Sequence, residues 1–76
     1  DPQNSLQMLR IITWTLSNLC RGSILPPLTM IQSILPWFCN FVSHDDAEIV
    51  IDSLWGLSFL SSGPTEILEL IIKIYP

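Results

Sequence analysis

The feature that most constrains this chain is a stretch that occurs twice. Trp14-Thr-Leu-Ser-Asn-Leu-Cys-Arg-Gly22 is followed, at an offset of 41 residues (14 to 55), by Trp55-Gly-Leu-Ser-Phe-Leu-Ser-Ser-Gly63. Tryptophan, two leucines, serine and glycine coincide at this single offset, which is more agreement than two unrelated helices would show. The chain therefore contains an internal repeat.

Both copies follow helical spacing. At about 100° per residue, one stripe of the first copy carries Leu6, Leu9, Thr13, Leu16 and Cys20. The matching stripe of the second copy carries Ala47, Val50, Leu54, Leu57 and Ser61. We expect these stripes to pack. A helical repeat with a period near 40 residues is typical of an α-solenoid of the armadillo or HEAT type, so the sequence predicts an all-α fold.

The repeated tryptophans lie off the packing stripes. The opposite stripe of the first copy is Gln7, Ile11, Trp14 and Asn18. The same four positions of the second copy are Glu48, Asp52, Trp55 and Phe59. A helical tryptophan is usually buried, and that is the simple alternative. Two indoles at equivalent positions favour an exposed ladder instead. Such a ladder contacts the methylene stems of Lys or Arg and attracts the cationic heads by roughly 0.5–2 kcal/mol each.

Asn18 lies one turn after Trp14, and its amide can both donate and accept hydrogen bonds. This property suits it to hold the backbone of an extended peptide that crosses the helices. Plain solvation is the alternative for a lone asparagine on a helix.

At these residues the sequence resembles importin α (karyopherin α), the armadillo-repeat adaptor that recognises nuclear localisation signals. Thr13 to Gly22 is similar to the end of that family's fourth repeat. Ile34-Leu35-Pro36, Asp52-x-x-Trp55 and Leu57 to Pro64 are similar to the fifth. The resemblance covers nearly the whole chain and implies an armadillo fragment whose parent array winds into a right-handed superhelix.

The resemblance also implies roles for particular residues. In that family the Trp-x-x-x-Asn motif lines an inner groove, where the indole packs on Lys side chains and the Asn holds the peptide backbone. By this resemblance Trp14, Asn18 and Trp55 are expected to bind peptide, and Asp52 is expected to lie near basic side chains of the peptide.

The chain departs from the family pattern at several positions. Phe59 stands where the family has Asn, or Tyr in this repeat, so a polar contact to the peptide is expected to be missing there. Ile11 replaces a polar groove residue, and Trp37-Phe38 is bulkier than the family pattern. The basic segment through which the family binds importin β does not occur in this sequence, so importin β binding is expected only through a segment absent here.

Length and composition favour a fragment of a longer array. A chain of 76 residues buries only about 60% of its unfolded surface, and solenoids generally need about three or more repeats. With 49% hydrophobic residues and a mean hydropathy of +0.47, the end faces are expected to be covered by neighbouring repeats. The start at Asp1-Pro2 rather than Met agrees. We expect residues 1–22 to end one repeat, 23–63 to form a complete one, and 64–76 to begin the next.

Charge excludes several partners. A net charge of −4 and a pI near 4.4 argue against nucleic acid, whose phosphates require Lys and Arg, and favour a basic partner.

The apolar runs are far shorter than the 18–20 residues or so of a membrane span. Cys20 and Cys39 are expected to be reduced and buried rather than disulfide-bonded, which predicts a location in the cytoplasm and nucleus.

Punctuating residues predict the helix boundaries. Asn4-Ser5 is expected to cap a helix that runs to about Cys20, with Gly22 as its stop. A short helix is expected over 29–35, and Pro36 is expected to open a separate, buried helix over 37–43. Asp45 and Glu48 are placed like a capping box for the long helix that follows. A last helix is expected over Ile67 to Tyr75.

The sequence contains no catalytic constellation. A metal or catalytic site at His44, Asp45 and Asp46 is the alternative to a simple turn, but adjacent residues lack the separated ligands that a metal shell needs. Ser17 and Ser58 occupy repeated helical positions where small side chains permit close packing, which argues against a nucleophile. We expect no enzyme activity, no metal and no cofactor. The leading hypothesis is peptide binding, and the alternative is a divergent or degenerate armadillo scaffold that binds no peptide of its own.

Overall fold

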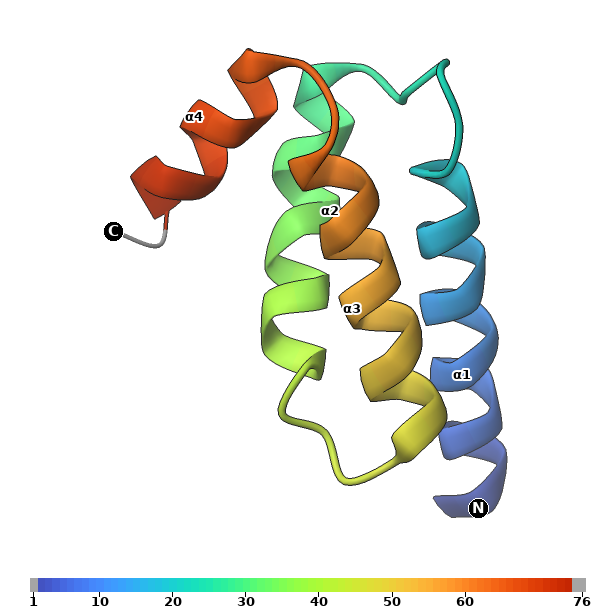
Figure 1. The fold of residues 1–76 in the computed structure, drawn as a ribbon. Helices are drawn as coiled ribbons and strands as arrows, with labels where there is room; N and C mark the ends of the chain where they lie inside the picture. The colour runs from blue at the N-terminus through green and yellow to red at the C-terminus, as the bar shows by residue number, and fades with distance from the viewer. Residues whose placement is uncertain (1, 75–76) are drawn as a thin grey trace.

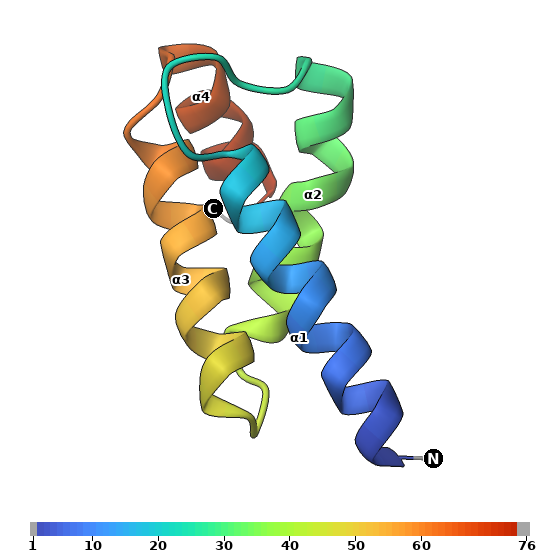
Figure 2. The same cartoon turned by 90° about the vertical axis from the view of Figure 1, so that its right-hand side faces the viewer.

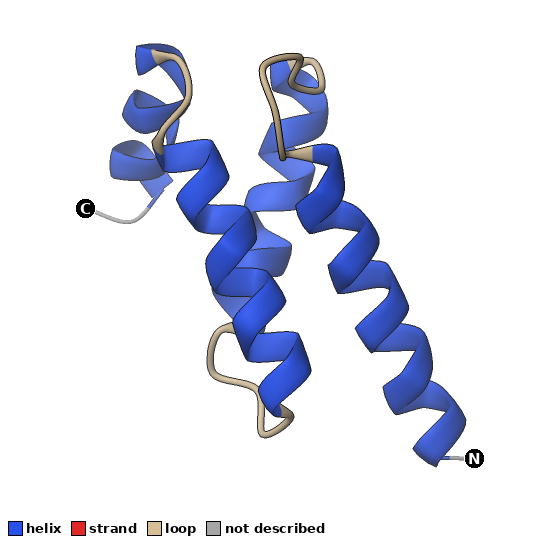
Figure 3. Ribbon diagram, turned by 45° about the vertical axis from the view of Figure 1, so that its right-hand side comes forward, coloured by secondary structure: helices blue, strands red, loops and turns tan. Residues whose placement is uncertain are grey.

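Four helices make up residues 2–74, the part of the chain that the computed structural model describes, and these residues contain no strand. The helices are α1 (Pro2–Leu19), α2 (Leu28–Phe41), α3 (Ala47–Ser61) and α4 (Thr65–Ile74). α1 and α3 lie side by side, and α2 packs behind α3 (Figures 1 and 3). α4 packs against one end of α2 and α3 (Figure 2). The predicted all-α class is confirmed.

The core lies between α2 and the helices that surround it. Ile31, Leu35 and Phe38 of α2 are at most 1% exposed. The same cluster takes in Leu60 of α3 and Ile67 of α4. Because α2 supplies most of the large buried side chains, it positions the two long helices that carry the repeated tryptophans.

α1 contributes small and polar side chains to the interior. Thr13, Ser17 and Cys20 are buried, in agreement with the predicted stripe at Thr13 and Cys20. The Nε1 of Trp37 donates a hydrogen bond of 3.1 Å to the Thr13 hydroxyl, which satisfies the indole. Both cysteines are free thiols; Cys20 is buried and Cys39 is half-buried. The residues that α1 itself buries, Thr13 and Ser17, are therefore small and polar, and the helix packs mainly against α3.

α3 buries a different face from the one that the repeat predicts. Three members of its predicted packing stripe are exposed, namely Ala47, Leu54 and Ser61. The residues that α3 buries are Ile49, Ser53, Gly56 and Leu60. Apolar residues occur all around this helix, so periodicity cannot select a face. In the fold α3 lies against both α1 and α2 and buries the side that contacts them, so the predicted stripe is wrong.

Residues at equivalent positions of α1 and α3 differ in burial. Thr13 of α1 is fully buried, whereas Leu54, its equivalent on α3, is 54% exposed. α3 covers α1 along its length, but among residues 2–74 no second long helix covers α3 in the same way (Figure 1). The equivalent faces therefore differ because their neighbours differ.

Pro36 does not divide α2. The helix is continuous from Leu28 to Phe41, so the two separate helices expected on either side of Pro36 are a wrong prediction. Proline removes one helical hydrogen bond and usually breaks or kinks a helix. Here Ile34 and Leu35 before it and Phe38 after it are buried in the same core. Only a continuous helix places all three there, and their burial outweighs the lost bond.

The ends of the other helices differ slightly from the expected ones. α1 begins at Pro2 rather than at Asn4-Ser5, which agrees with the preference of proline for a first helical turn. Gly22 follows α1 with a φ of +102°, a conformation that side chains disfavour. α4 runs from Thr65 to Ile74, and the expected end at Tyr75 lies outside the described residues.

The N-terminus of α3 is capped by Asp46, not by the predicted Asp45 and Glu48 pair. The Asp46 carboxylate accepts a hydrogen bond of 3.2 Å from the backbone N–H of Ile49. It also binds Arg10 of α1 through two bonds, Nη2 to Oδ1 at 2.6 Å and Nε to Oδ2 at 3.1 Å. Glu48 approaches the Arg10 Nε at 3.6 Å. One carboxylate thus caps α3 and joins it to α1.

The contacts of Asp46 with Arg10 and Ile49 should make the folding stability depend on pH. The hydrogen bond from Arg10 lowers the pKa of Asp46 below its ordinary value, although burial acts in the opposite direction. Such a carboxylate stabilises the fold above its unfolded-state pKa of about 3.9, and this contribution is lost as pH falls through the lower folded-state value. We expect Asp46→Asn to lower the urea midpoint at pH 7 and to leave it unchanged near pH 2. Asp45→Asn, which removes the same charge from an exposed neighbour, is the control, and an equal effect of Asp46→Asn at both pH values would contradict the assignment.

Candidate functional site

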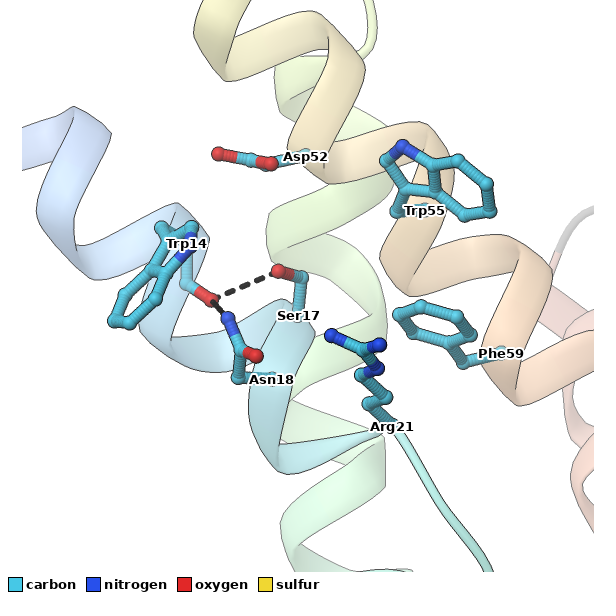
Figure 4. Close-up of a pocket in the computed structure, with 7 residues that line it drawn as sticks. All are labelled: Trp14, Ser17, Asn18, Arg21, Asp52, Trp55 and Phe59. Carbon is cyan, nitrogen blue, oxygen red and sulfur yellow. Dashed lines mark hydrogen bonds between the residues drawn. The ribbon is translucent and has the colours of Figure 1, made fainter.

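A hollow of about 280 Å³ opens between α1 and α3. It brings together all five residues that the sequence singles out, together with two others. The seven lining residues are Trp14, Ser17, Asn18, Arg21, Asp52, Trp55 and Phe59 (Figure 4). Two parallel repeats of the same spacing place them there, since equivalent positions of neighbouring helices face the same side.

The two indoles stand on opposite sides of this hollow. Trp14 comes from α1 and is 58% exposed, and Trp55 comes from α3 and is 55% exposed. Figure 4 shows Trp14 on the α1 side of the hollow and Trp55 on the α3 side, with Ser17 between the two helices. Exposed indoles of this kind contact aliphatic stems and attract cations through the ring face.

Asn18 is partly used by its own helix. Its Nδ2 donates a hydrogen bond of 2.9 Å to the Trp14 carbonyl, which also accepts one of 2.8 Å from the Ser17 hydroxyl (Figure 4). A side-chain amide has two N–H donors and an acceptor oxygen. One N–H and the Oδ1 of Asn18 therefore have no bond to any other described residue. The amide can still both donate to and accept from a bound backbone.

Asp52 supplies a negative charge without a counterion. Burial, and secondarily the negative charge of Glu48, raises the pKa of Asp52 above its ordinary value. Within residues 2–74 the ion pairs formed by Arg10 are with Asp46 and Glu48, and Asp52 takes part in none. A cation bound in the hollow would relieve this unfavourable environment.

Phe59 extends the aromatic wall of α3. Its ring stacks on that of Trp55, with ring centroids 5.7 Å apart and the planes inclined by 24°. The pair presents an apolar surface with no hydrogen-bonding group at Phe59. The wall can therefore hold methylene or aromatic groups by contact, but it cannot hold a peptide backbone at that position.

Arg21 is a lining residue that the sequence reasoning did not single out. It is exposed, lies just beyond the end of α1 and lines the hollow together with Asn18 and Phe59 (Figure 4). The signal was available, because Arg21 continues the helical series of Trp14 and Asn18 by a further three residues. The sequence predicts a helix end at about Cys20, one residue before Arg21, and the predicted stripe of Gln7, Ile11, Trp14 and Asn18 does not include it.

The turn before α3 does not hold a metal site in the structure. The Nδ1 of His44 accepts a hydrogen bond of 3.0 Å from the backbone N–H of Asp46, and the Asp46 carboxylate is taken by Arg10. Over residues 2–74 no group of three or more His, Cys, Asp or Glu side chains is placed to hold an ion. In the same range, none of the helices has the length and apolar character needed to cross a bilayer.

Comparison with known proteins adds independent information. No protein-family model matches the chain. Importin subunit alpha-B of Dictyostelium discoideum is 40% identical over 67 residues, which are 88% of this chain and 13% of that protein. Importin subunit alpha-4 of Arabidopsis thaliana is 39% identical over 73 residues, or 96% of this chain and 14% of that protein. Importin subunit alpha-3 of Caenorhabditis elegans is 34% identical over 74 residues, with the same two shares.

These relatives agree with one another and with the helical fold. The chain spans only 13–14% of their length, so the matches concern a short segment of each. None of the three names denotes an enzyme, in keeping with a sequence that contains no catalytic constellation. The alignments cover 88–96% of this chain, and they run through the repeated tryptophans and the helices that carry them. The chain is thus an armadillo-repeat segment related to importin α.

Proposed function

We propose that this chain is a nuclear import adaptor segment that binds Lys/Arg-rich nuclear localisation signal peptides in an extended conformation. The peptide lies across α1 and α3, with Lys stems beside Trp14 and Trp55. The free donor and acceptor of Asn18 hold its backbone, and Asp52 neutralises a cationic head.

One observation carries this proposal. Two half-exposed indoles from equivalent positions of α1 and α3 line opposite sides of a hollow that also contains an unpaired carboxylate. Indole faces and a carboxylate are the groups that attract an alkyl ammonium or guanidinium. The importin names of the relatives support cargo recognition of this kind.

The proposal extends to the place of the chain in a longer array. Residues 1–22 form the end of one repeat, 23–63 a complete repeat, and 64–76 the start of the next. Importin β is engaged through a segment outside this sequence, and the protein works in the cytoplasm and the nucleus. Nucleic acid, membranes and cofactors have no part in the proposal.

A paired substitution tests the groove. We expect Trp14→Ala with Asn18→Ala to weaken binding of a labelled Lys-rich peptide by about tenfold or more, from the loss of a cation–π contact and backbone hydrogen bonds. Fluorescence polarisation measures the effect. The same peptide with its central lysines changed to Ala should bind poorly to the unmodified chain, and added salt should weaken binding of the Lys-rich peptide.

The matched control changes the same kinds of side chain elsewhere. Ile72→Ala with Asn40→Ala removes an exposed apolar residue and an exposed asparagine that do not line the hollow. This control should bind the peptide as the unmodified chain does. If the groove pair leaves affinity unchanged, the mechanism is wrong. If neither the unmodified chain nor any variant binds the peptide while circular dichroism shows folded helices, the segment is a scaffold without peptide binding of its own.

A further inference from the structure

The hollow between α1 and α3 contains a positive charge that the proposed function does not use. Arg21 and Asp52 both line it, and Figure 4 shows them at its two ends with Ser17 between them. Within residues 2–74 neither side chain has an ion-pair or hydrogen-bond partner, so both charges are available to a ligand.

Arg21 is distinctive among the few cations of this chain. The sequence contains three Lys and Arg residues against seven Asp and Glu. Arg10 is held by Asp46 and Glu48, and Lys73 lies on α4, away from the hollow. Arg21 thus places a local positive charge in a groove whose other ionised group is negative, in a protein with a net charge of −4.

The two charges lie on opposite sides of the proposed peptide path. Asp52 lies three residues before Trp55 in α3. Arg21 lies seven residues after Trp14, beyond the end of α1. A peptide that crosses both helices between the indoles therefore has Asp52 on one flank and Arg21 on the other. Successive side chains of an extended chain point to opposite sides. Neighbouring residues of the peptide are thereby directed to the two different charges.

Resting on the proposed function, we infer that this groove selects peptides in which a basic residue has an acidic neighbour, the basic side chain facing Asp52 and the acidic one facing Arg21. Arg21 is a specificity-determining residue in this arrangement. Its guanidinium donates hydrogen bonds to the carboxylate of the peptide and repels a second cation at that flank.

The experiment compares three peptides that share a central lysine and differ in the residues on either side of it, which are Glu, Gln or Lys. With the unmodified chain we expect the Glu peptide to bind about two- to fivefold more tightly than the Gln peptide, since exposed charge pairs contribute modestly. Relative to the Gln peptide, the affinity of the Lys peptide should rise by less than its additional positive charge alone would produce. In Arg21→Glu the preference should reverse, so that the Lys peptide binds most tightly, and in Arg21→Gln the gain from Glu should disappear.

Lys73→Glu is the matched control, because it changes the net charge by the same amount at a residue outside the hollow. It should leave the order of the three peptides as in the unmodified chain. If Lys73→Glu shifts the order as much as Arg21→Glu does, net charge alone governs selection and the inference is overturned. It is also overturned if the Gln and Glu peptides bind equally to the unmodified chain.

These outcomes are distinct from a failure of the proposed function. If the proposed function itself is wrong, replacing the central lysine of the Gln peptide by Ala will not weaken binding. The inference fails by itself when binding needs the central lysine but is indifferent to its neighbours. Circular dichroism of each variant establishes that the helices are intact, and neither Arg21 nor Lys73 belongs to the buried core.

Discussion

Phe38→Ala should unfold a large fraction of this chain. The Phe38 side chain is fully buried, and it packs in the cluster that joins α2, α3 and α4. Truncating a buried phenylalanine costs about 3–5 kcal/mol, from lost transfer energy and the cavity left behind. A domain of this length has a free energy of unfolding of roughly 4–11 kcal/mol, so little of it would remain. Urea denaturation followed by circular dichroism measures the loss.

Met30→Ala provides the comparison within α2. Met30 is 49% exposed, so its truncation removes few packed contacts, and we expect a change of less than about 1 kcal/mol. A similar loss from the two substitutions would mean that α2 does not organise the core as the structure has it. Because Phe38 does not line the hollow, any peptide affinity of the folded fraction should be retained.

Gly56→Ala has the second largest expected effect. A Cβ at this position would lie 2.7 Å from Cε1 of the Phe38 ring and closer still to Cε2 and Cζ. Alanine favours a helix over glycine by about 1 kcal/mol, which alone would stabilise α3. The clash should dominate, because the ring is fully buried and overpacking a core costs about 1–3 kcal/mol, occasionally more. We expect a net lowering of the free energy of unfolding by about 1–3 kcal/mol.

Two further variants separate the clash from other causes. Ser58→Ala, at an exposed position of α3, should be neutral or slightly stabilising because its side chain is not buried and alanine favours a helix. In the double variant Gly56→Ala with Phe38→Leu, the smaller side chain makes room for the methyl group, so the combined loss should be smaller than the sum of the two single losses. Additive losses would show that Gly56 is needed for a reason other than its contact with Phe38.

The candidate site was more predictable than the core. Trp14 and Trp55 were placed on one surface because they occupy equivalent positions of a repeat, and a repeated surface needs no knowledge of what packs beneath it. Asn18 and Asp52 follow from the same helical spacing, and the structure brings them into the same hollow. Their peptide-binding roles remain predictions, to be tested as described above. Arg21 was missed because its position depends on how far the helical series runs past the expected helix end.

The packing of α3 could not be predicted in the same way. Isoleucine, leucine and aromatic residues surround this helix, so several faces are equally apolar. Leu54 is exposed and Gly56 buried because α1 and α2 cover one side only. Local chemistry was similarly ambiguous at the cap of α3. Asp45 and Asp46 are both good capping residues, and Arg10, which is 36 positions before Asp46, binds Asp46 in the fold.

An all-α repeat whose two copies share an exposed Trp, with Asn18 and Asp52 on the same faces, can be predicted from the order of residues, because helical spacing carries that information locally. The tertiary structure was needed to show that α2 runs through Pro36, that α3 buries Ser53 and Gly56, and that Arg21 lines the hollow. Each of these outcomes depends on contacts between segments distant in the chain. Such contacts can outweigh a proline's missing hydrogen bond or choose among equally apolar faces, and no local pattern records them.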